Sequence, residues 1–193
     1  MNRGIVLTHG AGSNADAPLL LALDRVFADA GYVVVRYTLP FRQRRKTGPP
    51  HPSGAAEDRA GLKQAVDLLR TSVDVVVLGG HSYGGRQASM LAAEQPDLVP
   101  ALLLLSYPLH PPGKPDQLRT AHFPNLRTPA LFVHGETDPF GTPDEMAQWV
   151  QPPHKLEIVA RAGHELKYGK FGLSAIVTRF EALLSGSTSG RTL

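Results

Sequence analysis

One serine in the sequence lies between glycines directly after a strongly apolar stretch. Residues 75–78 are V-V-V-L, and the run G-H-S-Y-G at residues 80–84 follows, with Ser82 at its centre. A serine on a sharp turn between a buried strand and a helix is typical of the nucleophile elbow, G-x-S-x-G. Glycines flank such a serine because its backbone is strained and the strand and helix approach closely. The pattern predicts a nucleophile, although a plain strand-to-helix turn also fits so short a run.

A serine hydroxyl is an effective nucleophile only when an imidazole accepts its proton. The imidazole in turn needs a carboxylate on its other nitrogen, which fixes the tautomer. Asp138 follows a later apolar run, with Glu136 as its nearest rival, and His164 follows a glycine after the last apolar run. Asp138 could instead cap a turn, and His164 could be a solvated loop histidine. The order Ser82, Asp138, His164 nevertheless matches the order of a known triad, and we expect these three to be catalytic.

An acyl-transfer site also needs donors for the negative charge that develops on the carbonyl oxygen, usually backbone N–H groups. We expect one donor to be Tyr83, the residue after the nucleophile. The second should come from the loop H-G-A-G at residues 9–12, where Ala11 is the candidate because its glycine neighbours let the backbone turn toward the site. These two residues form the predicted oxyanion hole.

The remaining candidates are pocket residues in loops that should lie near the serine. They are Gly10, Gly12, His81, Tyr107 and Phe140. His81, like His9, is expected to pack and hydrogen-bond around the turn rather than to catalyse. The proline-rich run at residues 107–115 is either a rigid connector or a partial wall of an acyl pocket.

Six apolar runs alternate with segments of helical periodicity and predict the fold. The runs lie at residues 5–7, 32–37, 75–78, 101–106, 129–135 and 156–159. The nearly continuous β-branched character of residues 32–37 indicates a strand that is buried on both faces, as in a parallel sheet. Strands that alternate with helices predict an α/β domain with helices on both faces. The loops after parallel strands share one edge, so all the candidate residues should lie on one rim.

Helix boundaries follow from capping residues and helix breakers. Asp16 is the expected cap of the first helix, and Thr142 is the cap of a later helix that starts with proline and has glutamate three residues after the cap. The last helix is expected over residues 173–184, with Gly186 past its end. We therefore expect one domain over residues 1–186 and a loose tail over residues 187–193.

Composition excludes several classes of function. The chain has 193 residues, 42% hydrophobic content, a formal net charge of +3 and no cysteine. A thiol nucleophile, a disulfide and a cysteine-ligated metal are therefore excluded, and the charge is too small to indicate nucleic-acid binding. No histidine pair has a metal-ligand spacing such as H-E-x-x-H. We expect no metal, cofactor, membrane span or secretory signal, and hence a cytoplasmic protein of open oligomeric state.

A basic run at residues 42–46 stands apart from this ordinary composition. Such a run is usually a solvated loop. The run also lies on the expected active-site rim. The alternative interpretation is therefore that it contacts an anionic substrate, such as a phosphate-bearing acyl carrier, or a partner.

Taken together, the motifs resemble the α/β-hydrolase family over nearly the whole chain. They are H-G-A-G at residues 9–12, G-H-S-Y-G at residues 80–84, Asp138, and G-H at residues 163–164. The resemblance implies a six-stranded parallel sheet and hydrolysis of ester or related acyl bonds. The chain lacks the first two strands usual in the larger family and any inserted cap domain, which argues against lipase-like interfacial activation and tight substrate enclosure.

A narrower resemblance rests on H-G-A-G at residues 9–12, Y-P-L-H-P-P-G-K-P at residues 107–115 and H-G-E-T-D-P-F-G at residues 134–141. These runs resemble a small bacterial branch related to the testis-expressed hydrolase-like protein and to a subunit of a chromatin acetyltransferase complex. The branch implies an uncapped domain and leaves the substrate undefined.

Three hypotheses for the function follow. The first is a serine hydrolase that acts on small esters or thioesters through an acyl-enzyme. The second is a catalytically idle scaffold that keeps the fold and binds through the rim, and the third is a small serine peptidase. The separation of Ser82 Oγ from His164 discriminates between the first two, because a general base must lie within hydrogen-bond reach.

Overall fold

Six parallel strands form the centre of the protein, in the order β2-β1-β3-β4-β5-β6. They are β1 (Arg3–Thr8), β2 (Tyr32–Tyr37), β3 (Val75–His81), β4 (Leu102–Leu105), β5 (Ala130–Gly135) and β6 (Lys155–Val159). The structure is a computed structural model and describes residues 1–167 and 172–189. Every strand pair is parallel. The predicted α/β fold with a six-stranded parallel sheet is confirmed.

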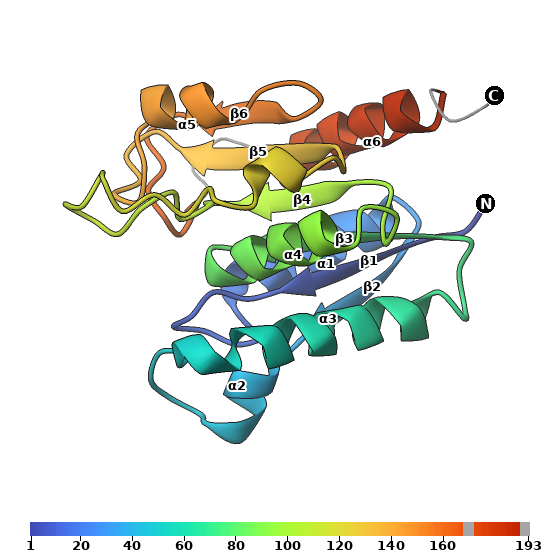
Figure 1. The fold of residues 1–193 in the computed structure, drawn as a ribbon. Helices are drawn as coiled ribbons and strands as arrows, with labels where there is room; N and C mark the ends of the chain where they lie inside the picture. The colour runs from blue at the N-terminus through green and yellow to red at the C-terminus, as the bar shows by residue number, and fades with distance from the viewer. Residues whose placement is uncertain (168–171, 190–193) are drawn as a thin grey trace.

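The strand order reverses at β1, which pairs with β2 on one side and with β3 on the other. In the register of β1 and β3, Thr8 is opposite Gly80. The loop that begins at His9 therefore starts beside the turn that carries Ser82. In open α/β sheets, ligands bind at the carboxyl ends of the strands where the order reverses, and Figure 1 shows the connecting loops gathered at this edge.

Helices cover both faces of the sheet (Figure 1). On one face lie α3 (Ala55–Leu69), α4 (Tyr83–Glu94) and the short α5 (Pro143–Trp149), and on the other lie α1 (Pro18–Asp29) and α6 (Leu173–Ser189). The short helix α2 (Pro40–Arg44) and the 3-10 turn Pro52–Gly54 lie in the connection between β2 and α3, and the 3-10 turn Phe123–Asn125 lies in the connection between β4 and β5.

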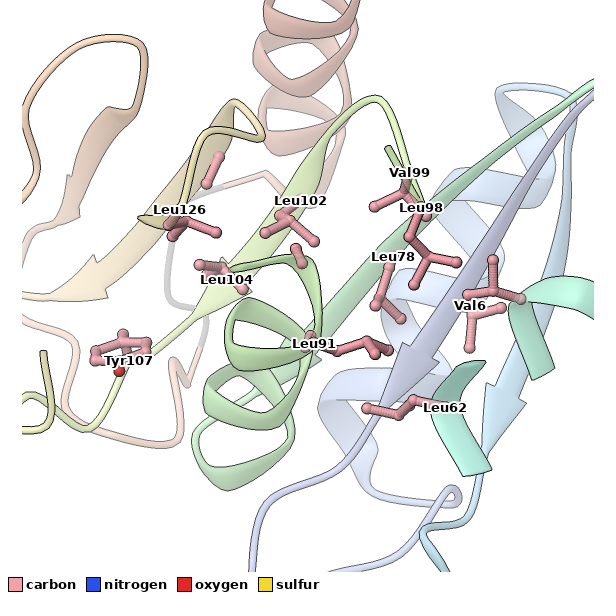
Figure 2. Packing of buried hydrophobic residues seen from close by; sticks show 14 of the residues in the cluster. Val6, Leu62, Leu78, Leu91, Leu98, Val99, Leu102, Leu104, Tyr107 and Leu126 are labelled. Atoms are coloured by element: carbon pink, nitrogen blue, oxygen red, sulfur yellow. The ribbon is translucent and has the colours of Figure 1, made fainter. Parts of the chain in front are cut away.

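Each sheet face has its own hydrophobic core because successive strand residues point to opposite faces. Val6 packs with Leu62 of α3 and Leu91 of α4 on one face, as Figure 2 shows. Ile5 and Leu7 belong to the cluster on the other face. This burial on both sides explains the continuous apolar runs of β1, β3, β4 and β5. The expectation that residues 32–37 are buried on both faces is wrong, because β2 lies at the edge of the sheet and its Val33 is 48% exposed.

Two predicted helix boundaries are wrong. The first helix is preceded by Ala17, whose side chain makes no capping hydrogen bond. Asp16 lies one residue earlier, and its carboxylate is 2.8 Å from the Arg36 guanidinium. At the other end of the chain, α6 continues through Gly186 to Ser189. Glycine in a helix costs about 1 kcal/mol but does not forbid the helix. The last part of the predicted tail, residues 190–193, lies outside the described residues.

The predicted loop over residues 38–56 contains α2 and a 3-10 turn, and α3 starts at Ala55. No helix in the described ranges is long and apolar enough to cross a membrane. Over the same part of the chain, no cluster of three or more histidine and acidic side chains could hold a metal ion.

Candidate active site

Ser82 lies on a strained turn between β3 and α4. Its backbone has φ 50° and ψ −117°, a conformation that is uncommon for a residue with a side chain. A Cβ on Gly80 would lie 2.6 Å from the backbone of Gly84 and Gly85, and one on Gly84 would lie 2.5 Å from the His9 carbonyl oxygen. Backbone cannot move aside cheaply, so both positions require glycine for strand and helix to approach this closely.

His164 lies between Ser82 and Asp138. The Ser82 Oγ to His164 Nε2 distance is 2.8 Å, and His164 Nδ1 is 2.9 and 3.0 Å from the two carboxylate oxygens of Asp138. A carboxylate only accepts hydrogen bonds, so Nδ1 carries the proton and Nε2 accepts from the serine hydroxyl. The Glu136 carboxylate instead accepts a bond of 2.6 Å from the backbone N–H of Arg161. The structure therefore brings together Ser82, Asp138 and His164, without the rival glutamate.

Asp138 is buried and held by the loop after β5. Its Oδ1 accepts a bond of 2.9 Å from the Phe140 N–H. His134 lies beneath it, with Nε2 3.8 Å from Oδ2 and 2.8 Å from the carbonyl oxygen of Gly141, to which it donates. Burial lowers the pKa of His134, although the Gly141 carbonyl and Asp138 oppose this. His134 was not among the predicted site residues, because its partners follow it in a turn whose shape a sequence does not show.

Two aromatic neighbours support His164. The ring of Phe140 is 4.2 Å from the His164 ring, with an interplanar angle of 31°. His81 Nε2 is 2.8 Å from the His164 carbonyl oxygen and donates to it, so His81 holds the backbone of the loop that carries His164. Burial lowers the pKa of His81. The expectation that His81 packs and hydrogen-bonds around the turn agrees with this position.

Ala11 and Tyr83, the two predicted oxyanion donors, line the same cavity as Ser82. Tyr83 is the first residue of α4, where backbone N–H groups have no intrahelical partner and the helix dipole is positive. In the described chain, neither N–H donates a hydrogen bond to another protein group. This arrangement suits a pair of donors to an oxyanion.

Arg42 holds the loop that carries Ala11, a role that the sequence does not predict. Its buried guanidinium donates to the carbonyl oxygens of Ala11 at 2.5 Å, Ser13 at 2.9 Å, Gly48 at 3.0 Å and Arg45 at 3.1 Å. The expectation of a solvated basic loop is therefore wrong for Arg42. The reason is that backbone carbonyls from two loops converge on it and replace its water shell.

His9 and Asp58 connect the same loops to the turn. His9 Nδ1 donates to the Gly10 carbonyl oxygen at 2.8 Å, and its Nε2 accepts from the Leu39 N–H at 3.1 Å. Burial lowers the pKa of His9, which favours the neutral ring that these two bonds require. The buried Asp58 carboxylate accepts from the Tyr83 hydroxyl at 2.7 Å and from the Phe41 N–H at 3.0 Å.

A cavity of about 670 Å³ opens beside Ser82. It is lined by Ala11, Pro49, Pro50, His51, Pro52, Ser53, Ala55, Ala56, Arg59, Ser82, Tyr83, Arg86, Met90, Pro108, Arg119 and Phe140.

Of the predicted pocket residues, the structure places Phe140 in the cavity wall and Gly10, Gly12 and His81 outside it. Tyr107 is fully buried behind the wall, where its ring packs in the core and its hydroxyl donates to the Arg119 carbonyl oxygen at 2.6 Å.

A parallel sheet with a serine on the turn after β3 and a histidine on the loop after β6 is the architecture of an α/β hydrolase. The sequence profile of the family described as an alpha/beta hydrolase domain matches residues 1–174. The chain belongs to this family.

Named relatives agree with the assignment. ABHD14B of Pongo abelii, a proposed protein-lysine deacylase, is 30% identical over 161 residues, which is 83% of this chain and 73% of the relative. The human ABHD14B is 26% identical over 163 residues, with the same coverage of both chains. The narrower resemblance, to a small bacterial branch related to the testis-expressed hydrolase-like protein and to a chromatin-complex subunit, stays a prediction.

Solved structures share the fold. Est1E from Butyrivibrio proteoclasticus superposes with a TM-score of 0.70 at 15% identity and covers 97% of this chain and 89% of its own. Dienelactone hydrolase from Anabaena variabilis also has a TM-score of 0.70, at 24% identity, over 96% of this chain and 87% of its own.

Proposed function

We propose that the protein is a serine hydrolase that cleaves small ester or thioester substrates through an acyl-enzyme. Ser82 is the nucleophile, His164 is the general base and then the general acid, and Asp138 orients His164. The N–H groups of Ala11 and Tyr83 bind the oxyanion. No metal or cofactor is needed for this chemistry, and the partner is a small acyl compound.

The observation that carries the proposal is a continuous chain of hydrogen bonds from Ser82 through His164 to Asp138. The Ser82 Oγ to His164 Nε2 distance is 2.8 Å, and the His164 Nδ1 to Asp138 Oδ2 distance is 2.9 Å. Such a chain is what the transfer of a proton from a serine hydroxyl requires. A scaffold has no use for it, and the short distances therefore favour the enzyme over the binding protein. The peptidase alternative shares the same geometry and differs only in substrate.

In the acylation step, Ser82 Oγ attacks the carbonyl carbon while His164 Nε2 takes the hydroxyl proton. The negative charge moves to the carbonyl oxygen, toward the Ala11 and Tyr83 N–H groups. When the tetrahedral intermediate collapses, the bond to the leaving group breaks and His164 returns the proton to the departing oxygen or sulfur. Asp138 stabilises the imidazolium that exists between these two transfers.

In the deacylation step, a water molecule replaces the leaving group. His164 accepts a proton from the water as its oxygen attacks the acyl carbon, and the second tetrahedral intermediate collapses with return of that proton to Ser82 Oγ. The products are the free acid and the regenerated enzyme. The cavity of about 670 Å³ beside Ser82 has room for a small acyl group and water.

The test is hydrolysis of p-nitrophenyl esters of increasing chain length, followed by labelling with a fluorophosphonate probe. We expect hydrolysis by the wild-type protein, a fall of about 10⁴-fold or more in kcat for Ser82→Ala, and labelling of Ser82 alone. Ser106 is the matched control for labelling. It also follows a strand and has a positive φ, but it lies outside the cavity lining. Labelling elsewhere, or unchanged activity of Ser82→Ala, would overturn the proposal.

The substrate panel should include an acylated lysine peptide. The ABHD14B relatives are described as proposed protein-lysine deacylases, and the same acyl-enzyme route cleaves an amide when His164 protonates the leaving amine. A larger kcat/KM for acyl-lysine than for any ester would extend the substrate class from esters to amides.

A further inference from the structure

The cavity beside Ser82 is lined by three arginines, and its described lining contains no carboxylate. Arg59 comes from α3, Arg86 from α4, and Arg119 from the connection between β4 and β5. Arg59 is neutralised by Glu94, at 3.0 Å. For Arg86 and Arg119, no acidic side chain in the described chain lies within ion-pair distance. Two cationic groups of the cavity therefore lack a counter-ion from the protein.

Arg86 lies one helical turn from the nucleophile. Its backbone N–H donates to the Ser82 carbonyl oxygen at 2.9 Å, and residues four apart on a helix project from the same face. Met90 follows one turn later and also lines the cavity. A nucleophile, a guanidinium and an apolar side chain therefore follow one another along the cavity face of α4.

Both guanidinium groups are partly withdrawn from water. Among the described residues, the buried Arg86 Nε has no hydrogen-bond partner, and the Arg119 guanidinium makes one long contact of 3.5 Å to the Pro108 carbonyl oxygen. Burial, and then the charge of Arg86, lowers the pKa of Arg119. Burial and the charges of Arg86 and Arg59 lower the pKa of His122 to about 4. A charge withdrawn from water is costly unless an opposite charge pairs with it.

We propose that Arg86 and Arg119 bind an anionic oxygen group, a carboxylate or a phosphate, carried by the substrate that Ser82 attacks. The inference rests on the proposed function and names the class of its substrate. The planar guanidinium fork matches both groups in shape and charge. Met90, Phe140 and the prolines of the wall supply an apolar path for the chain between this group and the scissile carbonyl.

The basic run at residues 42–46 is the other candidate for an anion contact, but the structure indicates a different set of residues. Arg42 uses its donors on backbone carbonyls, and residues 42–46 do not line the cavity. The unpaired charges of the cavity come instead from α4 and the β4–β5 connection.

The first test compares p-nitrophenyl monoesters of succinate, glutarate and adipate with neutral esters of the same chain length. We expect kcat/KM to favour the anionic ester of at least one length by about tenfold or more, the size expected for a charge-assisted pair. Arg86→Gln and Arg119→Gln should each lower this ratio by about tenfold. Arg86→Lys, which keeps the charge but not the fork, should retain part of the preference.

Arg25→Gln is the matched control, because Arg25 is exposed on α1, on the opposite face of the sheet. It should leave the ratio unchanged. A wild-type preference for neutral esters, or a preference that persists in both Arg86→Gln and Arg119→Gln, would overturn the inference. The neutral esters report separately on the proposed function, since loss of their hydrolysis in Ser82→Ala measures the nucleophile and not the anion site.

The second test does not depend on turnover. Glutarate and inorganic phosphate are titrated calorimetrically into Ser82→Ala protein and into the Ser82→Ala, Arg86→Gln double variant. Binding of either anion that weakens by about tenfold or more in the double variant supports the inference, and the tighter anion identifies a carboxylate or a phosphate substrate. Absence of binding by both anions, or equal binding to the two proteins, contradicts it.

Discussion

His164 is held at its ring and at its backbone by different residues. Asp138 bonds to Nδ1, whereas His81 donates to the carbonyl oxygen of the same residue. Phe140 packs against the ring from a third side. These contacts together fix the position of the ring.

Asp138→Asn tests the role of the carboxylate. The amide can donate to Nδ1, which would place the imidazole proton on Nε2 and prevent it from accepting the Ser82 proton. We expect kcat to fall by roughly 10³–10⁴-fold, with a smaller effect on KM, measured by steady-state hydrolysis of a p-nitrophenyl ester. Glu136→Gln is the control and should keep its activity, because that carboxylate accepts from the Arg161 N–H. A comparable loss in both variants would contradict the assignment of Asp138.

Arg42→Met tests whether Arg42 positions the loop that carries Ala11, the proposed oxyanion donor. Without the guanidinium, the carbonyls of Ala11 and Ser13 lose a buried donor and the Ala11 N–H loses its fixed direction. We expect a loss of stability of about 1–3 kcal/mol and a fall in kcat of roughly ten- to a hundredfold with little change in KM, because oxyanion donors act in the transition state.

The control for Arg42 is Lys46→Gln, an exposed position of the same basic run. It should leave stability and kcat as they are. Arg42→Lys should recover only part of the loss, since an ammonium group cannot reach four carbonyls. If Arg42→Met lowers the unfolding midpoint but keeps kcat when fully folded, Arg42 stabilises the loop without positioning the donor.

At the scale of elements, four strands end at the edge of the sheet that carries Ser82, and the loop after each supplies a different part of the site. They are β1, β3, β5 and β6. The loop after β1 contains Ala11, the turn after β3 contains Ser82, and the loops after β5 and β6 contain Asp138 and His164. Parallel pairing puts these four strand ends on one edge. Each element therefore contributes one chemical group, and the sheet supplies their relative positions.

The close approach of β3 and α4 predicts the effect of Gly80→Ala. The new Cβ would meet the backbone of Gly84 and Gly85 at 2.6 Å, so the turn must open and displace Ser82. We expect a loss of stability of about 1–3 kcal/mol, as for other overpacked sites, together with loss of esterase activity. Urea unfolding and ester hydrolysis measure the two effects. Gly172→Ala, where a Cβ would meet nothing within 4 Å, should change stability much less.

At the scale of the whole molecule, burial lowers the pKa of several histidines below its ordinary value of 6.5. These histidines are His9, His81, His122, His134 and His154. They are neutral in the folded protein at pH values where the unfolded chain already binds protons. Stability should therefore depend on pH even without acidic ion pairs.

The expected pH dependence has a definite sign. Because the folded-state pKa values are lowered, the stabilisation is fully present above pH 6.5 and is lost as the pH falls toward the folded value, about 4 for His122. The unfolded state binds more protons in this window, so the free energy of unfolding rises with pH there. Urea unfolding across the window measures the slope. His122→Gln should flatten it, whereas exposed His51→Gln should not, and a slope of opposite sign would contradict the explanation.

Much of the fold could be predicted because its signals are local. The apolar runs of β1 and β5 are continuous since both faces of the sheet are covered, and Thr142 and Glu145 form the predicted capping box. The prediction that Asp16 caps the first helix was wrong because a charged side chain near a helix start can also bond elsewhere, here to Arg36.

The sequence by itself determined the residue types that can do chemistry, their order along the chain, and the strand-turn-helix setting of Ser82. Only the tertiary structure decided which buried groups support them and which side chains line the cavity. Arg42, Asp58 and Arg86 have no local signature, because their roles arise from the order of the strands and the packing of loops between them. Contacts between segments tens of residues apart depend on that packing, and a pattern of neighbouring residues does not contain it.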